Sequence, residues 1–200
     1  MKYGPRAGVA GVAVVALAAM LLTLLTTRGS AGAPRQIDTL PTANLVTTDG
    51  ATVRVDELAR RGLLTVLVFS SDDCPCYDAH RGALQTLASR FGGQGVQFFL
   101  IDSERHPGGY RRMPRQGDTS LPVLVDAGGG FARAVNAGYA TFSLLVSPTG
   151  KILYRGGITS ARKDVNSQAK PYLGAAIESA LAGRDPAPAS TKALGCMLRI

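Results

Sequence analysis

Apolar residues follow two different patterns along this chain, and the change from one to the other predicts its elements. Residues 63–69 (LLTVLVF) are almost continuously apolar and rich in β-branched side chains, which is typical of a buried strand. From residue 79 onward the apolar positions recur at helical spacing, which predicts a helix that ends at Gly92. Residues 96–101 (VQFFLI) form a second buried run. This part of the chain therefore predicts a β-α-β unit.

Shorter apolar stretches predict the elements on either side of that unit. Ahead of it, residues 44–55 carry an Asp49-Gly50 turn between two strand-like runs, which predicts a hairpin. Asp56 is suited to capping a short helix that ends at Arg60. After the unit we expect a strand at 122–126, a helix at 131–137, a hairpin of strands at 142–146 and 151–154, and a helix at 171–181. Strands alternating with helices imply an α/β fold with a parallel core sheet and antiparallel edges.

Residues 1–33 have the organisation of a secretory signal. Lys2 and Arg6 precede an uncharged run at 7–27, and small residues follow Arg28. The run is also nearly long enough to cross a bilayer, so an uncleaved membrane anchor is the alternative. In both cases we expect the rest of the chain outside the cytoplasm, in the periplasm or cell envelope, either secreted or anchored.

Composition limits what the exported part can be. With 46% hydrophobic and 18% charged residues among 200, the chain is expected to be globular. Setting aside Lys2, Arg6 and Arg28 leaves 19 of the 22 basic residues against 14 acidic ones, scattered and without interleaved aromatic residues. This pattern argues against nucleic acid as a partner. We divide the exported part into a linker at 34–41, one domain at 42–183 and a C-terminal tail at 184–200.

The three cysteines carry the candidate chemistry. Cys74 and Cys76 flank Pro75 where the first buried strand is followed by the helix, and proline suits a first helical turn. Unpaired backbone N–H groups and the helix dipole favour a thiolate there, although two aspartates just before the site oppose it. Cys196 lies in the tail. An odd number of cysteines leaves at least one thiol unpaired, transient or metal-bound.

With this order of elements and with cysteines between a strand and a helix, the chain resembles the thioredoxin-like superfamily. Within it, the N-terminal hairpin resembles that of the exported redoxin branch (AhpC/TSA type). The resemblance covers residues 40–181, and segments 154–157 (YRGG) and 191–196 (TKALGC) are similar to a bacterial redoxin subgroup with a Cys-Pro-Cys site. It implies a thioredoxin-like fold, with a central mixed sheet flanked by helices and an N-terminal β-hairpin extension.

The resemblance also implies a thiol–disulfide oxidoreductase without a cofactor. Cys74, five residues after Phe69, would be an exposed attacking thiol, and Cys76 or Cys196 would resolve the mixed disulfide. Protein thiols and disulfides, or a small thiol, would be the partners. The superfamily usually has its second cysteine at the position of Tyr77, so a Cys74–Cys76 disulfide would close a tighter ring. Strain in that ring would favour an oxidant or isomerase.

The residues expected to contact a substrate are Pro75, Tyr77, Thr141 and Phe142. Other residues of the superfamily site are replaced in this chain: Asp73 stands in place of a tryptophan, Val68 in place of a buried carboxylate, and Phe142 in place of a cis-proline. A peroxiredoxin is not favoured, because Leu67 replaces the proline of its motif even though Ser71 fits the hydroxyl position.

A copper-handling protein is the alternative from another class. Cys76 and His80 are four residues apart and share a helical face, with Cys74 nearby, and thiolates with an imidazole suit Cu(I) or Zn(II). Copper-delivery proteins of this fold use a longer cysteine spacing and a late histidine, which this chain lacks. The simpler interpretation is that His80, His106 and the arginines of 111–115 are solvated. A redox-inert interaction domain is the third hypothesis.

Overall fold

The computed structural model describes Met1, residues 37–105 and residues 121–200. By its contacts the chain divides into two units, Met1–Arg35 and Gln36–Ile200, and the fold described below is that of the second. The predicted signal or anchor, the first part of the predicted linker, His106 and the 111–115 arginines lie outside the described residues. Among the described residues, no helix is long and apolar enough to cross a membrane.

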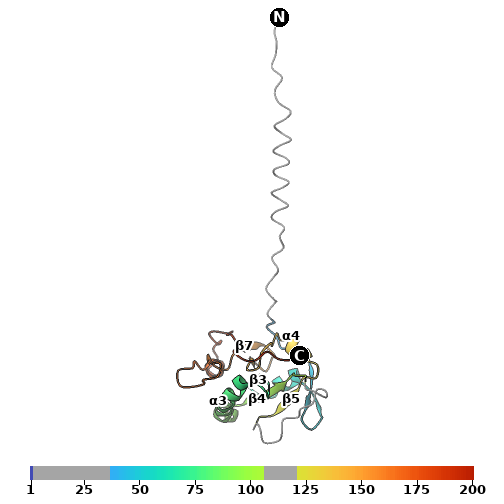
Figure 1. Ribbon diagram of the computed structural model, residues 1–200, viewed down its shortest axis with the longest axis vertical. Helices are drawn as coiled ribbons and strands as arrows, with labels where there is room; N and C mark the ends of the chain where they lie inside the picture. The colour runs from blue at the N-terminus through green and yellow to red at the C-terminus, as the bar shows by residue number, and fades with distance from the viewer. Residues whose placement is uncertain (2–36, 106–120) are drawn as a thin grey trace. The chain divides into compact units, whose positions relative to one another are not determined.

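A seven-stranded mixed sheet forms the centre of the Gln36–Ile200 unit, with β3, β4 and β5 labelled side by side in Figure 1. In chain order the strands are β1 (Asn44–Thr47), β2 (Thr52–Arg54), β3 (Leu64–Ser70), β4 (Val96–Asp102), β5 (Val123–Val125), β6 (Ser143–Val146) and β7 (Ile152–Gly156). Their order in the sheet is β2-β1-β5-β4-β3-β6-β7. The β3–β4 and β4–β5 pairs are parallel and the others are antiparallel. The predicted mixed sheet with an N-terminal hairpin is confirmed.

Strand β3 lies in the interior of the sheet, and all seven of its residues are buried. Its parallel register with β4 runs from Leu64 opposite Val96 to Ser70 opposite Asp102. Parallel strands end at the same edge of a sheet, so the residues after Ser70 and those after Asp102 lie together. This edge carries the cysteine site.

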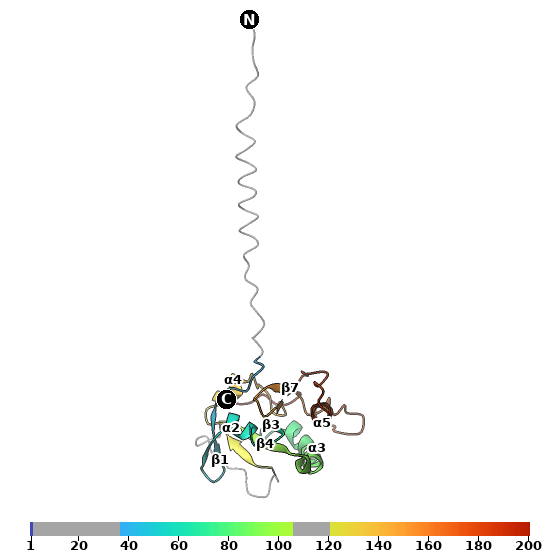
Figure 2. The ribbon, with the colours of Figure 1, turned by 180° about the vertical axis from the view of Figure 1, so that it is seen from behind.

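Among the described residues of this unit, the chain forms four α-helices and one 3-10 helix: α2 (Val55–Ala59), α3 (Pro75–Phe91), η1 (Gly92–Gln94), α4 (Gly130–Ala134) and α5 (Tyr172–Leu181). Figure 2 shows α3 and α5 on one side of the unit and α2 and α4 on the other. Helices α3 and α5 are joined by an ion pair of 2.7 Å between Arg90 and Glu178. Helix α4 packs on the sheet by stacking the Phe131 ring on that of Phe69, with 5.8 Å between centroids.

Two of the predicted helices differ from those observed. Helix α2 begins one residue before Asp56, and Asp56 does not cap it: its carboxylate accepts hydrogen bonds from the Arg54 guanidinium at 2.8 and 3.2 Å instead. Helix α4 covers Gly130–Ala134 rather than 131–137. The chain leaves the helix there because Asn136 adopts a left-handed conformation, with φ of 58°.

Both ends of the Gln36–Ile200 unit pack against the last hairpin. Near the beginning, the Leu40 N–H donates to the Gly150 carbonyl and the Ile152 N–H donates to the Asp38 carbonyl, each at 2.8 Å. In the predicted tail, Ser190 forms a parallel bridge with Arg155 of β7. The chain continues from there towards the end of β3, and this course brings Cys196 to the other cysteines.

Candidate functional site

A disulfide joins Cys74 to Cys196, 122 positions later, with 5.9 Å between the Cα atoms. Cys74 is the residue that caps α3, and a tight turn connects it to β3, since its N–H donates to the Ser71 carbonyl at 3.2 Å. Pro75 is the first helical residue, as the sequence predicts. Cys76, in the same helical turn, is a free thiol. The pairing in the structure is therefore Cys74–Cys196 and not the Cys74–Cys76 ring.

The third sulfur lies close to this disulfide. The sulfur atoms of Cys74, Cys76 and Cys196 are all within 4.8 Å of one another. Cys74 and Cys76 are buried, with 0% and 1% of their surface exposed, and Cys196 is half-buried. The expectation of an exposed Cys74 is wrong for this disulfide-bonded state, because residues from the end of the chain cover it.

The covering residues are held by backbone pairing with the loop ahead of β6. The Ala140 N–H donates to the Cys196 carbonyl at 2.9 Å, and the Leu198 N–H donates to the Gly138 carbonyl at 3.0 Å. Between them, Tyr139 and Met197 form an antiparallel bridge. We call residues 195–199 the closing segment and residues 138–140 the docking loop. The closing segment thus pairs with the docking loop in antiparallel orientation, as two short strands would.

Glycines allow this close approach at two places. A Cβ at Gly195 would lie 1.7 Å from the Ala140 carbonyl oxygen, and a Cβ at Gly156 would lie 2.3 Å from the Thr191 hydroxyl. Gly156 also has a φ of 142°. The two sequence segments of the redoxin subgroup, 154–157 and 191–196, are therefore in contact with each other, and the second also contacts the docking loop.

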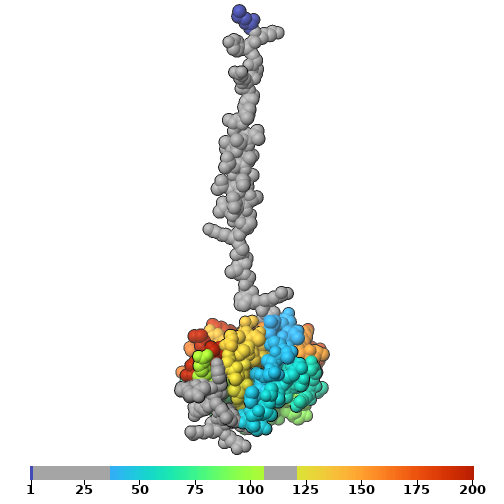
Figure 3. All heavy atoms as spheres, turned by 90° about the vertical axis from the view of Figure 1, so that its right-hand side faces the viewer, coloured from blue at the N-terminus to red at the C-terminus, as the bar shows by residue number. Residues whose placement is uncertain are grey.

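An ion-pair network that was not predicted from the sequence anchors the end of the closing segment. The Arg199 guanidinium lies 3.1 Å from an Asp73 carboxylate oxygen and 3.4 Å from one of Glu104, to which the Ser71 hydroxyl donates at 2.7 Å. In Figure 3 the red C-terminal residues lie against the yellow-green ones that follow β4. The hydrogen bond to Asp73 and the Glu104 carboxylate raise the pKa of Arg199. The sequence signal for this network was an acidic residue within three positions of the end of each of two buried strands, Asp73 after β3 and Glu104 after β4.

His80 lies inside the molecule, which corrects the interpretation of a solvated residue. It is 1% exposed, with Nδ1 2.7 Å from the Cys76 carbonyl oxygen and Nε2 3.0 Å from the Thr159 hydroxyl. A carbonyl only accepts, so Nδ1 carries a proton. Both ring nitrogens are thus engaged away from the sulfurs. Among the described residues, the group whose spacing could hold a metal consists of the three cysteines without His80.

The four residues predicted to contact a substrate have different environments. Pro75 is exposed and Phe142 is half-buried, whereas Tyr77 and Thr141 are each 1% exposed. Burial raises the pKa of Tyr77, and the Arg81 guanidinium lies 5.3 Å from its ring centroid. Thr141 has a left-handed φ of 73°, and its N–H donates to the Phe69 carbonyl at 2.8 Å. This bond fixes the docking loop relative to β3, and the backbone of Ala140 makes the contact with Cys196.

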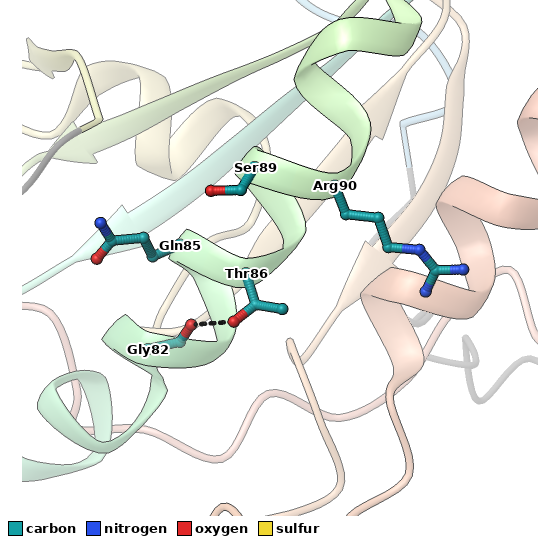
Figure 4. Close-up of a pocket in the computed structure, with 5 residues that line it drawn as sticks. All are labelled: Gly82, Gln85, Thr86, Ser89 and Arg90. Carbon is teal, nitrogen blue, oxygen red and sulfur yellow. Dashed lines mark hydrogen bonds between the residues drawn. The ribbon is translucent and has the colours of Figure 1, made fainter.

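A depression on the outer surface of α3 is not part of this site. Its lining residues are Gly82, Gln85, Thr86, Ser89 and Arg90. Figure 4 shows their side chains fanning out from the helix rather than converging on one point, and the Thr86 hydroxyl donates to the Gly82 carbonyl at 2.9 Å. The chemistry-bearing groups are at the other end of the helix.

Comparisons with known proteins agree with this architecture. No curated protein matches the chain. Among solved structures, it is similar to a hypothetical protein from Sinorhizobium meliloti 1021 (20% identity, 84% of this chain and 96% of that one, TM-score 0.72). An uncharacterized conserved protein from Geobacillus kaustophilus is similar over 84% of this chain and 94% of that one, at 22% identity and a TM-score of 0.71.

A third similar structure is that of a protein from Chlorobium tepidum assigned as the thiol:disulfide interchange protein DsbE. It shares 18% identity over 76% of this chain and 98% of that one, with a TM-score of 0.54. These likenesses show the fold, which is thioredoxin-like. The family model described as Redoxin matches residues 36–169. Because this match spans well over half of the chain, the protein belongs to the redoxin family.

Proposed function

We propose that the protein is an exported thiol–disulfide oxidoreductase in which Cys74 and Cys196 form the redox pair. The observation that supports this most is the disulfide at the start of a 17-residue helix, with a free third thiol beside it. A helix N-terminus stabilises a thiolate through its unpaired N–H groups and its dipole. Cys74 is therefore the proposed nucleophile.

In the proposed reaction, the Cys74 thiolate attacks one sulfur of a substrate disulfide. That S–S bond breaks, the second substrate sulfur leaves as a thiolate and takes up a proton, and a mixed disulfide remains on Cys74. The Cys196 thiolate then attacks the Cys74 sulfur, which releases the first substrate sulfur and forms the Cys74–Cys196 disulfide. The substrate gains two electrons and two protons from the two thiols. Run in reverse, the same steps oxidise a substrate dithiol.

Cys76 is the alternative resolving thiol. Its sulfur lies within 4.8 Å of both others. In the mixed disulfide, the Cys76 thiolate would attack the Cys74 sulfur, form Cys74–Cys76 and release the first substrate sulfur, so the substrate again gains two electrons and two protons from the two thiols. We give Cys196 the first role because it is the partner of Cys74 in the structure.

Export is the second part of the proposal. The basic residues followed by an apolar run within residues 1–33 support a signal or membrane anchor. The disulfide supports it as well, since such bonds persist in oxidising compartments and are rare in the cytosol. The expected partners are protein thiols and disulfides, or a small thiol, in the periplasm or cell envelope.

Three serine variants test the redox assignment. We expect Cys74→Ser to abolish reduction of insulin disulfides while its circular dichroism spectrum stays that of the parent. Cys196→Ser should accumulate a mixed disulfide on Cys74, seen by mass spectrometry without reductant, and Cys76→Ser should keep most of the activity. Unchanged exchange in Cys74→Ser would refute the assignment. A Cys76→Ser variant as inactive as Cys74→Ser would move the redox pair to Cys74 and Cys76.

Copper handling is the second candidate, and the clustering of three sulfurs favours it. In the reduced protein, three thiolates at this spacing would suit Cu(I), with Cys196 in the place that the sequence analysis gave to His80. We expect the reduced protein to take one Cu(I) from bicinchoninate. Cys76→Ser and Cys196→Ser should each lose that binding, whereas His80→Asn should keep it. Equal Cu(I) affinity in the parent and Cys76→Ser would exclude the site. If the thiols neither take part in disulfide exchange nor bind copper, the third hypothesis, a redox-inert interaction domain, would remain.

A further inference from the structure

The closing segment covers the sulfur at which exchange is proposed to occur. Cys74 has 0% of its surface exposed, and the residues above it are Cys196 and its neighbours. A substrate that reacts with Cys74 must therefore lie where the closing segment lies. The contacts of the closing segment therefore indicate which substrate segments can bind in its place.

The main contacts are made by backbone atoms. The docking loop donates from Ala140 N–H to the Cys196 carbonyl and accepts at the Gly138 carbonyl from Leu198 N–H. An extended peptide whose backbone can approach the docking loop closely enough can make these two bonds, because both use main-chain atoms. The docking loop is thus able to hold a cysteine-bearing strand from another protein.

Side chains around this strand add selectivity at individual positions. Before the cysteine, a Cβ on Gly195 would collide with the Ala140 carbonyl oxygen, so glycine is required there. After it, Met197 is 73% exposed and makes no demand on side-chain type, whereas Leu198 is 7% exposed and belongs to the hydrophobic core.

The third position after the cysteine faces acidic groups. Arg199 lies within 3.4 Å of carboxylate oxygens of Asp73 and Glu104. Glu104 is only 3% exposed, and a buried carboxylate is stable when a cation stays beside it. An incoming strand that displaces Arg199 is favoured when it brings a basic side chain of its own.

We propose that the closing segment is a tethered occupant of the substrate site, and that this site selects extended protein segments of the pattern glycine, cysteine, any residue, apolar residue, arginine or lysine. This inference rests on the proposed exchange function. In the reduced protein the closing segment competes with the partner segment for the docking loop. The Cys74 thiolate then attacks the cysteine sulfur of the bound segment, whose former sulfur partner leaves as a thiolate.

Peptides test the pattern directly. The probe is acetyl-Ala-Leu-Gly-Cys-Met-Leu-Arg amide with its cysteine linked to 5-thio-2-nitrobenzoate, and the protein is the full chain carrying Cys76→Ser and Cys196→Ser. Attack by Cys74 on the peptide sulfur releases thionitrobenzoate, which is followed at 412 nm as a second-order rate. Replacing the peptide glycine by alanine should slow the reaction about thirtyfold, as expected for two lost hydrogen bonds. Replacing arginine by glutamate should slow it about fivefold, as expected for a partly exposed ion pair. Replacing the methionine by alanine is the matched control and should leave the rate unchanged.

Competition by the closing segment is tested in the same chain with Gly195→Ala added. Its extra methyl group displaces the segment, so the parent peptide should react faster than before. Equal rates for all peptides, or no acceleration by Gly195→Ala, would overturn the inference while leaving thiol exchange intact. No release from any peptide, when iodoacetamide still alkylates Cys74, would instead count against the proposed function. Disulfide-linked dimers of the native chain joining Cys74 to Cys196 of a second copy would assign the docking loop to another copy and overturn the partner class.

Discussion

Gly195→Ala should make the Cys74–Cys196 disulfide easier to reduce. The added Cβ would lie 1.7 Å from the Ala140 carbonyl oxygen and 2.7 Å from its carbon, whereas a Cβ atom in a folded protein essentially never lies within about 3 Å of a non-bonded heavy atom. The clash is with backbone, so side-chain rotation cannot relieve it. The closing segment must move away from the docking loop by more than about an ångström. The N···O distances of the two backbone bonds, now 2.9 and 3.0 Å, would then exceed hydrogen-bond range.

The size of the effect follows from what this movement breaks. The bonds from Ala140 N–H to the Cys196 carbonyl and from Leu198 N–H to the Gly138 carbonyl are lost, at about 1 kcal/mol each. In the disulfide form the Cys74–Cys196 bond keeps the closing segment docked all the time, whereas in the reduced protein the segment docks only part of the time, so the loss falls mainly on the disulfide form. About 2 kcal/mol corresponds to roughly a thirtyfold shift in the thiol–disulfide equilibrium, or about 40 mV towards easier reduction.

The equilibrium is measured in glutathione redox buffers at pH 7, with alkylation and mass spectrometry to count free thiols. A Cys76→Ser background leaves Cys74 and Cys196 as the remaining pair. Gly138→Ala is the matched control: it lies on the other side of the same pairing, where a Cβ would meet no atom within 4 Å, and should not shift the equilibrium. If the Gly195→Ala and Gly138→Ala proteins have the same thiol–disulfide equilibrium constant, backbone docking does not stabilise the disulfide and the reasoning fails.

Two further predictions concern buried polar groups around the site. His80→Ala should lower the free energy of unfolding in urea by about 3 kcal/mol, and a double-mutant cycle with Thr159→Ala should give a coupling of about 1 kcal/mol. The exposed Thr86→Ala serves as the control, and zero coupling would contradict the hydrogen bond of 3.0 Å. Burial raises the pKa of Tyr154 to about 12 from an ordinary value of 10.0. The fold therefore disfavours the tyrosinate, so the contribution of this group to stability is complete below pH 10 and is lost as the pH rises towards 12. Absorbance at 295 nm should show a step near pH 12 that is absent in Tyr154→Phe and unchanged in Tyr139→Phe, an exposed tyrosine. A Tyr154→Phe titration identical to that of the parent would show that this phenol ionises normally.

The sheet and the main helices could be predicted from local patterns. The continuous apolar run of β3 indicates a strand that is buried on both faces, and the helical spacing of apolar residues in α3 indicates a helix that is buried on one face. Both patterns can be read from residues that are close together in the sequence. For the helices, the predictions that failed were the capping by Asp56 and the length of α4. Asp56 does not cap α2 because its carboxylate binds the Arg54 guanidinium instead. Helix α4 is shorter than predicted because Asn136 adopts a left-handed backbone conformation.

For the site, the sequence by itself determined that two thiols stand at the junction of a buried strand and a helix. Only the tertiary structure decided that Cys74 pairs with Cys196, that His80 turns inward to Thr159, and that Glu104 meets Arg199. These contacts join residues separated by 79 to 122 positions in the chain. Neither residue of such a pair carries a periodic signal of its own, because the contact depends on how the sheet order and the docking loop bring distant segments to one edge. The pairing between the closing segment and the docking loop is made by main-chain atoms and needs only a glycine at position 195, so it becomes visible only when the fold is known.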